Sequence, residues 1–410
     1  RQDPVLKFMV VAVTAYGMAT LEGPMLSIKS VNSLSHYTDW TIAHVHTGAL
    51  GWNGFLTFGM LYWLMPQLYN TRLWSTRLAT AHFWIGLLGI MFYVVPLYWA
   101  GVTQGLMWKE FTPDGFLQYP NFLETLRQII PMHMLRSVGG LLFLSGVIMM
   151  IVNLVMTARQ GSFIPEVEVQ APALERDVPA DEPHPYHHRW LERKPLLFTV
   201  LALVAVLIGG AVEAIPTFLI RSNVPTIAAV RPYTPLELHG RDLYIREGCV
   251  SCHSQMIRPF RSETERYGPY AKAGEYVYDH PFLWGSKRTG PDLLRVGRKY
   301  PNAWHVKHMA DPRATSPGSI MPAYPWLLSR KLDTSTTAAK VKLMRKLGVP
   351  YPAGYEHQAI DDVKAQALTI AEDLKSSTPV DADREIIALI AYLQRLGTDI
   401  RTDLAGGGAR

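Results

Sequence analysis

The chain has 410 residues and a formal net charge of +6 at pH 7. A length of this kind suits two or three domains. The mean hydropathy of +0.05 lies between that of an average soluble protein and that of a pure bundle of membrane helices, so two unlike parts are averaged. The sequence has no Lys/Arg block, which argues against nucleic-acid binding.

Five stretches in the first 220 residues are long and apolar enough to span a bilayer. They are Val5–Met25, Trp40–Leu64, Leu78–Val102, Met132–Thr157 and Leu196–Ile220. Lys and Arg residues are more frequent between the second and third stretches and between the fourth and fifth. The positive-inside rule therefore predicts that the N-terminus and residues 159–194 lie in the cytoplasm, and that everything after the fifth stretch lies outside.

The second stretch contains two histidines, His44 and His46, separated by one residue. Each residue of an α-helix turns by about 100°, so these side chains are expected on opposite faces. One metal ion is not readily held in this way, because a helical chelate uses positions i and i+4. Two separate cofactors, one on each side of the helix, can be held. The alternative is two histidines that simply hydrogen-bond neighbouring helices.

Residues 159–194 are rich in Pro, Glu and Asp and lack apolar periodicity, which predicts a linker. Beyond the fifth stretch, a helix over Tyr233–Gly248 leads into a short motif, which a long Gly- and Pro-rich loop follows. Apolar spacing then predicts three further helices over Ala338–Leu347, Ile360–Ser376 and Asp383–Leu396.

The short motif is Cys249-Val-Ser-Cys252-His253, a C-x-x-C-H segment typical of covalent c-type haem attachment. In such a site both thiols bond the haem and the histidine binds the iron. A redox cysteine pair or half of a zinc site are the alternatives. Neither accounts for the adjacent histidine, and the sequence holds no second cysteine pair to complete a zinc site.

A second axial ligand is expected downstream of the motif. Met321 precedes a proline in a turn, which presents its thioether rigidly, and Met–His ligation suits electron transfer. Met256 lies too close to His253 to reach the opposite face of a haem. Met309 lies in a helix-like stretch and is expected to serve packing.

Several polar residues of the membrane part are candidates for supporting roles. Glu22, near the outer end of the first stretch, is expected either to accept a hydrogen bond from a ligating histidine or to face water. His36 and Asp39 lie at the outer end of the second stretch, where haem propionates would emerge. His82 and His133 are expected at the membrane interfaces rather than as ligands.

These motifs carry a resemblance to one enzyme family. The stretches Asp3-Pro-Val, Leu21-Glu-Gly-Pro-Met and His44-Val-His resemble the last third of the catalytic subunit of cbb3-type cytochrome c oxidases. From about Trp190 onward, the chain resembles the mono-haem cytochrome c subunit of the same enzyme. The segments that carry this second likeness are Gly248-Cys-Val-Ser-Cys-His, Trp284-Gly-Ser-Lys-Arg-Thr-Gly-Pro-Asp and Met321-Pro-Ala-Tyr-Pro-Trp.

The resemblance implies an all-α protein in which polytopic membrane helices of a haem-copper oxidase precede a class I-like cytochrome c domain on a single-span anchor. The implied parts are the last four helices of the catalytic subunit (1–158), a cytoplasmic linker (159–194), a transmembrane anchor (195–220) and a periplasmic mono-haem domain (221–410).

The resemblance also implies roles for single residues. His44 would be the proximal ligand of the high-spin haem b, with Glu22 hydrogen-bonded to it. His46 would be a ligand of the low-spin haem b, and His36 would hold a haem propionate. His253 and Met321 would bind the haem c iron, to which Cys249 and Cys252 attach the porphyrin. The family also has a calcium ion near the propionates, for which Ser286 is a candidate ligand.

The implied activity is that of a respiratory oxidase in the bacterial inner membrane, which reduces oxygen to water and translocates protons. Its electrons would come from a dihaem cytochrome c subunit or another cytochrome c. The copper ligands of the family lie on earlier helices, so this chain is expected to be a C-terminal piece of a longer subunit or to rely on another chain. A nitric oxide reductase and a non-catalytic membrane-anchored cytochrome are the alternatives.

Overall fold

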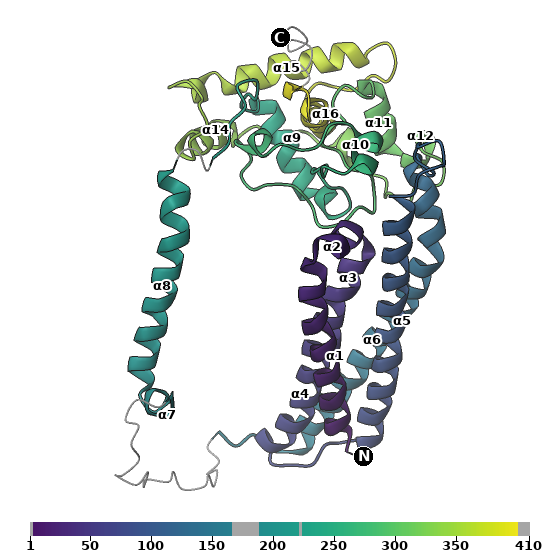
Figure 1. The fold of residues 1–410 in the computed structure, drawn as a ribbon, viewed down its shortest axis with the longest axis vertical. Coiled ribbons are helices and arrows are strands. Elements are labelled where there is room, and N and C mark those ends of the chain that lie inside the picture. The colour runs from purple at the N-terminus through teal and green to yellow at the C-terminus, as the bar shows by residue number, and fades with distance from the viewer. Residues whose placement is uncertain (1–2, 166–187, 221–223, 401–410) are drawn as a thin grey trace. The chain divides into compact units, whose positions relative to one another are not determined.

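The computed structural model describes residues 3–165, 188–220 and 224–400, and every regular element in these ranges is a helix (Figure 1). β-Structure is limited there to isolated bridges. Residues 1–164 and 228–410 form one compact unit, and residues 165–227 form another. Most of the predicted linker, residues 166–187, lies outside the described residues.

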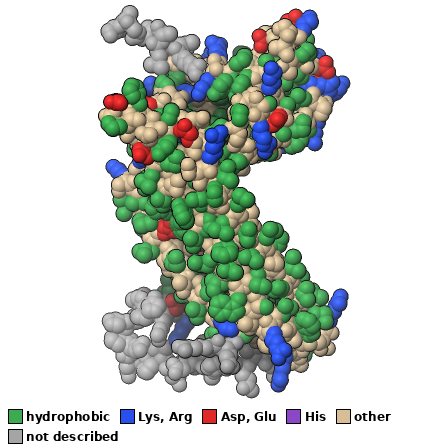
Figure 2. Space-filling view, turned by 90° about the vertical axis from the view of Figure 1, so that its right-hand side faces the viewer, with side chains coloured by type: hydrophobic (Ala, Val, Ile, Leu, Met, Phe, Trp, Pro, Cys, Tyr) green, Lys and Arg blue, Asp and Glu red, His purple; other side chains and the backbone are tan. Residues whose placement is uncertain are grey.

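The first part of the larger unit is a bundle of long apolar helices. Its elements are α1 (Pro4–Ser27), α2 (Lys29–Ser35), α3 (Asp39–His46), the π-helix η1 (Thr47–Gly54), α4 (Phe55–Leu68), α5 (Thr76–Met107) and α6 (Phe122–Gln160). Three of them, α1, α5 and α6, are long and apolar enough to cross a membrane. Hydrophobic side chains cover most of the bundle surface that Figure 2 shows, as expected for a surface that faces lipid.

The second predicted span is divided into α3, η1 and α4, which follow one another without a break from Asp39 to Leu68. The π-helix begins directly after His46, at Thr47. Such segments are rare and often lie at functional sites, because one wider turn changes the direction of the side chains around it. No pattern in the sequence predicted this division.

Helices α5 and α6 pack closely because small residues face each other. A Cβ atom on Gly89 would lie 2.7 Å from the backbone nitrogen of Phe143, and one on Gly139 would lie 2.6 Å from that of Tyr93. Glycine at both positions therefore lets the two backbones approach, as is common between membrane helices. Helix α6 begins ten residues before the predicted start at Met132, at Phe122.

The smaller unit contains α7 (His188–Glu192) and α8 (Pro195–Leu219). Helix α8 matches the fifth predicted span. Its stretch Pro195–Thr217 is the most apolar of the four candidate membrane spans in the described residues, and none of it is buried within the protein.

The second part of the larger unit is built from shorter helices. They are α9 (Pro235–Arg246), η3 (Cys249–Ser251), α10 (Arg261–Tyr267), η4 (Ala273–Tyr276), α11 (Asn302–Ala310), α12 (Pro312–Thr315), α13 (Trp326–Ser329), α14 (Thr337–Lys346), η5 (Tyr355–His357), α15 (Ala359–Leu374) and α16 (Glu385–Arg395). The predicted helices before the motif and at the end of the chain are confirmed. The long loop was predicted too simply, because α10 to α13 lie within it.

The core of this second part forms where α9 crosses α16. A Cβ atom on Gly240 of α9 would lie 1.9 Å from the carbonyl oxygen of Ala388 on α16, so the crossing requires glycine. Apolar residues from both helices, including Leu236, Tyr244 and Ile390, are buried around it. Cys249 belongs to the same cluster, which places the C-x-x-C-H segment directly against the core.

Candidate functional site

His44 and His46 face different neighbours, as their spacing predicts. His44 Nδ1 lies 3.3 Å from a carboxylate oxygen of Glu22 on α1. His46 Nδ1 lies 2.7 Å from the carbonyl oxygen of Ile42, one turn back, and its ring centroid lies 4.9 Å from that of Tyr93 on α5. Each Nδ1 is therefore engaged within the bundle. The Nε2 atoms remain as the positions where iron could bind, although His46 Nε2 also lies 3.4 Å from the Tyr93 hydroxyl.

Glu22 is buried, with 9% of its surface exposed. One of its oxygens accepts a hydrogen bond of 2.7 Å from Trp40 Nε1, and the other accepts a close one from the Tyr98 hydroxyl. The alternative that Glu22 faces water is therefore wrong. Three groups from α3 and α5 fix the carboxylate beside His44.

His36 follows α2 and is half-buried, and its ring centroid lies 4.2 Å from that of Tyr37. Burial, and then the charges of Arg258 and Arg288, lower the pKa of His36 from 6.5 to about 4. The carboxylate of Glu263, which pairs with both guanidinium groups, acts on this pKa in the opposite direction.

His82 and His133 are packed between helices, and their position at the membrane interfaces stays a prediction. His133 Nε2 lies 2.7 Å from a carboxylate oxygen of Asp39, whose backbone N–H donates to Gln104 at 2.7 Å. His82 is fully buried, with its Nδ1 3.0 Å from the Tyr62 hydroxyl. Both imidazoles contact side chains of other helices, and the sequence of one helix does not indicate such contacts.

The C-x-x-C-H segment combines two thiols with a histidine whose ring is held by a backbone carbonyl. Cys249 and Cys252 are both free thiols. Burial, and then Glu247, raise the pKa of Cys249 to about 12. His253 Nδ1 lies 2.8 Å from the carbonyl oxygen of Pro291, which orients the ring and leaves Nε2 for a metal.

Gly290 closes the other side of this histidine. A Cβ atom on Gly290 would lie 2.3 Å from Cε1 of His253, so a side chain there would displace the ring. Gly290 N–H also donates to the carbonyl oxygen of Cys252 at 2.9 Å. The loop around residue 290 and the motif therefore form one tightly packed piece.

Two methionines contact the core around this motif. Met321 is half-buried against the cluster that contains Cys249, and Met309 is buried within that cluster. The N–H of Tyr324 donates to the carbonyl oxygen of Met309 at 2.7 Å, which joins the two segments. Met256 lies apart from them, with its N–H donating to Asp292 at 2.9 Å.

Ser286, the candidate calcium ligand, is exposed between Gly285 and Lys287. Over the described ranges, no group of three or more His, Cys, Asp and Glu side chains is close enough together to hold a metal ion. The neighbourhood of Ser286 instead contains a contact with the bundle, because Lys287 forms a bridge with Tyr37.

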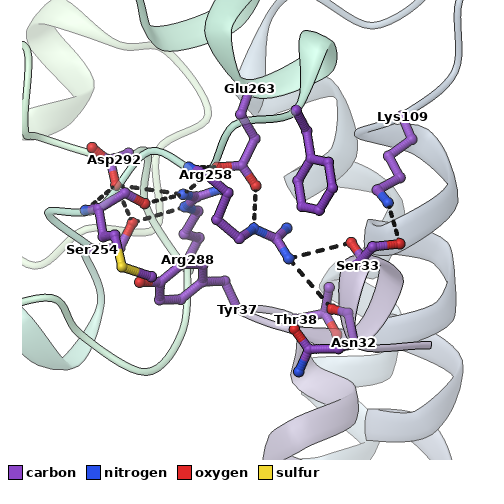
Figure 3. Close-up of polar contacts among 12 residues, drawn as sticks. Asn32, Ser33, Tyr37, Thr38, Lys109, Ser254, Arg258, Glu263, Arg288 and Asp292 are labelled. Atoms are coloured by element: carbon purple, nitrogen blue, oxygen red, sulfur yellow. Dashed lines mark hydrogen bonds and ion pairs between the residues drawn. The ribbon is translucent and has the colours of Figure 1, made fainter. Parts of the chain in front are cut away.

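Sequence reasoning missed the junction between the bundle and the C-x-x-C-H part. Tyr37, Arg258 and Arg288 meet there, as Figure 3 shows. Arg288 lies inside a segment that carries the family resemblance, but nothing in the spacing of the three residues indicates that they meet.

Comparison with known proteins divides the chain in the same way. Residues 188–400 match the family described as cytochrome c oxidase, mono-haem subunit/FixO. Residues 1–142 match the family described as cytochrome c and quinol oxidase polypeptide I.

Curated relatives match the first part of the chain. A bacteroid cytochrome c oxidase subunit 1 homolog of Bradyrhizobium diazoefficiens is 53% identical over 173 residues, which cover 42% of this chain and 31% of the relative. A cbb3-type cytochrome c oxidase subunit of Stutzerimonas stutzeri is 45% identical over 154 residues, covering 37% and 32%. A nitric oxide reductase subunit of the same species is 29% identical over 168 residues, covering 39% and 33%.

The chain thus spans about a third of the length of these relatives. The histidine pair beside Glu22 and the C-x-x-C-H segment against its core lie in the two parts that the two families match. The chain therefore belongs to the family of the mono-haem subunit of cytochrome c oxidase, and its first 142 residues are similar to cytochrome c and quinol oxidase polypeptide I.

Proposed function

We propose that this chain is part of a terminal respiratory oxidase that receives electrons at haem c and passes them through two haems b to oxygen, which is reduced to water with proton translocation. The observation that supports this most strongly is the pair His44 and His46 on one helix, with each Nδ1 already engaged and the two rings turned toward α1 and α5. A helix of this kind holds two cofactors at a fixed separation.

In this proposal, His44 Nε2 binds the high-spin haem b and His46 Nε2 binds the low-spin haem b. Glu22 holds the ring of His44 in one orientation and, as a carboxylate, makes that imidazole more electron-rich. The carbonyl of Ile42 does the same for His46 more weakly, because it carries no net charge. His36 binds a propionate, a role that rests on its place at the outer end of the second predicted span.

Haem c would be attached through Cys249 and Cys252, with His253 and Met321 as axial ligands. When bound, this group supplies a one-electron redox centre of raised potential. The free thiols, the hydrogen bond from His253 to Pro291 and the close packing of Gly290 fit such a group. Met321 is favoured over Met309, because its turn is less deeply buried and lies against the same cluster as Cys249.

The remaining cofactors and partners would come largely from outside this chain. Copper would be held by ligands on another chain or segment, and calcium would lie near the propionates with Ser286 among its ligands. A dihaem cytochrome c subunit or another cytochrome c would donate electrons, and other oxidase subunits would complete the enzyme in the lipid bilayer.

We also retain the predicted topology for the bacterial inner membrane. Residues 1–158 would be oxidase helices, 159–194 a cytoplasmic linker, 195–220 an anchor and 221–410 a periplasmic domain. The apolar surface of α8 and the absence of any membrane-length apolar helix among described residues after 224 support this division.

The test is an optical spectrum of the reduced, carbon monoxide-treated complex, with metal analysis of the same sample. Haem c, a CO-reactive haem b and copper are the expected result. Because one relative is a nitric oxide reductase subunit, extra iron without copper is the outcome that would contradict the oxidase. Haem c without any CO-reactive haem would instead identify an electron carrier.

A further inference from the structure

Tyr37 occupies an unusual place at the junction of the two parts of the larger unit. It lies between α2 and α3, is 1% exposed and has a backbone φ of +69°. Residues other than glycine seldom adopt this left-handed region, and for a bulky side chain it is energetically unfavourable. Its carbonyl accepts the N–H of Arg288 at 2.9 Å, and its hydroxyl donates to the carbonyl of Trp284 at 3.3 Å.

Arg288 connects this tyrosine to the C-x-x-C-H segment. Its guanidinium carbon lies 4.4 Å from the centroid of the Tyr37 ring, and the side chain is fully buried. Nε donates to the hydroxyl of Ser254 at 2.7 Å, and Nη2 lies 3.5 Å from the carboxylate of Asp292 (Figure 3). Ser254 follows His253 in the chain, and Asp292 follows the proline that orients the ring of His253.

A second arginine fastens α2 to the same cluster. Arg258 Nη1 donates to the carbonyls of Asn32 and Ser33 at 3.3 Å each, and its Nε donates to Glu263 at 2.5 Å. Glu263 also pairs with Arg288 at 2.9 Å. Although burial acts to raise it, the pKa of Glu263 is held below its usual range by Arg288 and Arg258. The carboxylate therefore remains charged between the two guanidinium groups.

The bundle side of this contact is equally fixed. Tyr37 stands two residues before Asp39, the first residue of α3, which carries His44 and His46. The carboxylate of Asp39 is held by His133 of α6, and its N–H by Gln104 of α5. A continuous series of packed and hydrogen-bonded groups thus runs from the histidine helix through Tyr37 and Arg288 to Ser254, which follows His253, and to Asp292, which follows Pro291.

We propose that Tyr37 and Arg288 are positioning residues that fix the distance and orientation of the C-x-x-C-H segment relative to the helix of His44 and His46. This inference rests on the proposed function. Simple adhesion of two domains does not call for such groups, since apolar residues can often replace a buried ion pair without loss of stability. A strained tyrosine stacked on a buried, doubly paired arginine instead specifies one relative placement.

The experiment compares Tyr37→Phe with Tyr37→Asn in the complete oxidase complex. Phenylalanine keeps the ring under Arg288, whereas asparagine tolerates the left-handed backbone but removes the ring. Tyr270→Asn is the matched control, because Tyr270 is 47% exposed. Two quantities are measured. The first is the amide hydrogen exchange of residues 285–290. The second is the rate of electron transfer from haem c to haem b, in which haem c is oxidised and haem b is reduced.

We expect Tyr37→Asn to raise the exchange of residues 285–290 and to slow electron redistribution at least about tenfold, with both haems still present. Tyr37→Phe and Tyr270→Asn should leave both quantities near those of the unmodified complex. Faster hydrogen exchange with an unchanged rate of electron transfer would show that the contact only holds the two parts together, and would overturn the proposal. An unchanged exchange pattern would overturn it as well.

Arg288→Lys covers the case in which Tyr37→Asn loses haem. Lysine keeps the charge but loses the planar group that stacks on Tyr37 and reaches both Ser254 and Glu263. A slower rate is expected, and an unchanged rate would contradict the proposal. If the unmodified complex shows no CO-reactive haem b, the proposed function fails instead, while hydrogen exchange still reports whether Tyr37 fixes residues 285–290.

Discussion

The helix that carries His44 and His46 and the loop that carries His253 solve the same problem with different neighbours. The helical histidines are oriented by Glu22 of α1, by Tyr93 of α5 and by a carbonyl one turn back. His253 is oriented by Pro291, which lies 38 residues later in the same part of the chain. The helix sets the direction of its two histidine side chains, but groups on other helices help to hold their rings. The ring of His253 is held by a group from the same part of the chain.

The largest expected effect tests whether the two sites are independent. Replacing Cys249 and Cys252 together by serine should abolish covalent haem attachment, since serine cannot form the thioether bonds. The supporting contacts of His44 and His46 described above all lie within the bundle, so the haem b content should remain. Covalent haem staining after denaturing electrophoresis, together with the optical spectrum of haem b, measures both. Loss of haem b as well would show that the loop site supports the helical one.

Glu22→Gln tests the contact between Glu22 of α1 and His44. The amide keeps the shape but loses the negative charge that faces His44 Nδ1. Changes of this kind beside a ligating histidine typically lower metal affinity or activity about 10–100-fold. Glu213→Gln on α8 is the control, since this carboxylate also lies on an apolar helix but is exposed. Oxygen consumption and CO binding by the reduced complex are the readouts. Equal effects of the two variants would argue against a role for Glu22.

Gly290→Ala tests the close packing of residue 290 against the ring of His253. The new methyl group would start 2.3 Å from the ring of His253, so the ring or the loop must move. Overpacking of this kind costs about 1–3 kcal/mol. A lower haem c content or a shifted haem c midpoint potential is expected. Gly140→Ala is the control, because its nearest contact would be at 3.9 Å. An unchanged haem c content and midpoint potential would mean that the loop around residue 290 moves without displacing the ring of His253.

The contrast between the two sites also explains what the sequence could predict. The length of the apolar stretches correctly indicated four of the five predicted spans as single helices, and the C-x-x-C-H segment is recognisable because its residues are contiguous. The spacing of His44 and His46 predicted their opposite faces. Contacts between distant helices left no local pattern, which is why the contacts of His82 with Tyr62 and of His133 with Asp39 were not predicted.

The junction was missed for the same physical reason. Tyr37 meets Arg288 across 251 positions of the chain, and each residue alone resembles an ordinary loop residue. The π-helix after His46 was also unforeseen, because no pattern in the sequence marks it. Sequence patterns therefore predicted elements and contiguous motifs, and the structure was needed for contacts that join them.

The smallest expected effect concerns a histidine that belongs to neither site. His239 of α9 is 2% exposed, with its Nε2 2.8 Å from the Thr337 hydroxyl and its Nδ1 accepting from Lys340 at 3.0 Å. Burial, and then the charge of Lys340, lower the pKa of His239 from 6.5 to about 4. The unfolded chain therefore takes up a proton first, so this contribution to stability is complete above pH 6.5 and is lost as the pH falls toward 4.

With allowance for solvent screening, the free energy of unfolding of this part should fall by about 1 kcal/mol from this group between pH 7 and pH 5. His239→Gln keeps a hydrogen-bonding side chain that does not titrate, so its stability should depend less on pH. Hydrogen exchange of α9 and α14 in the complex, measured at both pH values, gives the comparison. Because the haem sites are untouched, the haem spectra should be the same in both proteins. An equal pH dependence in the two would mean that His239 does not remain neutral in the folded chain.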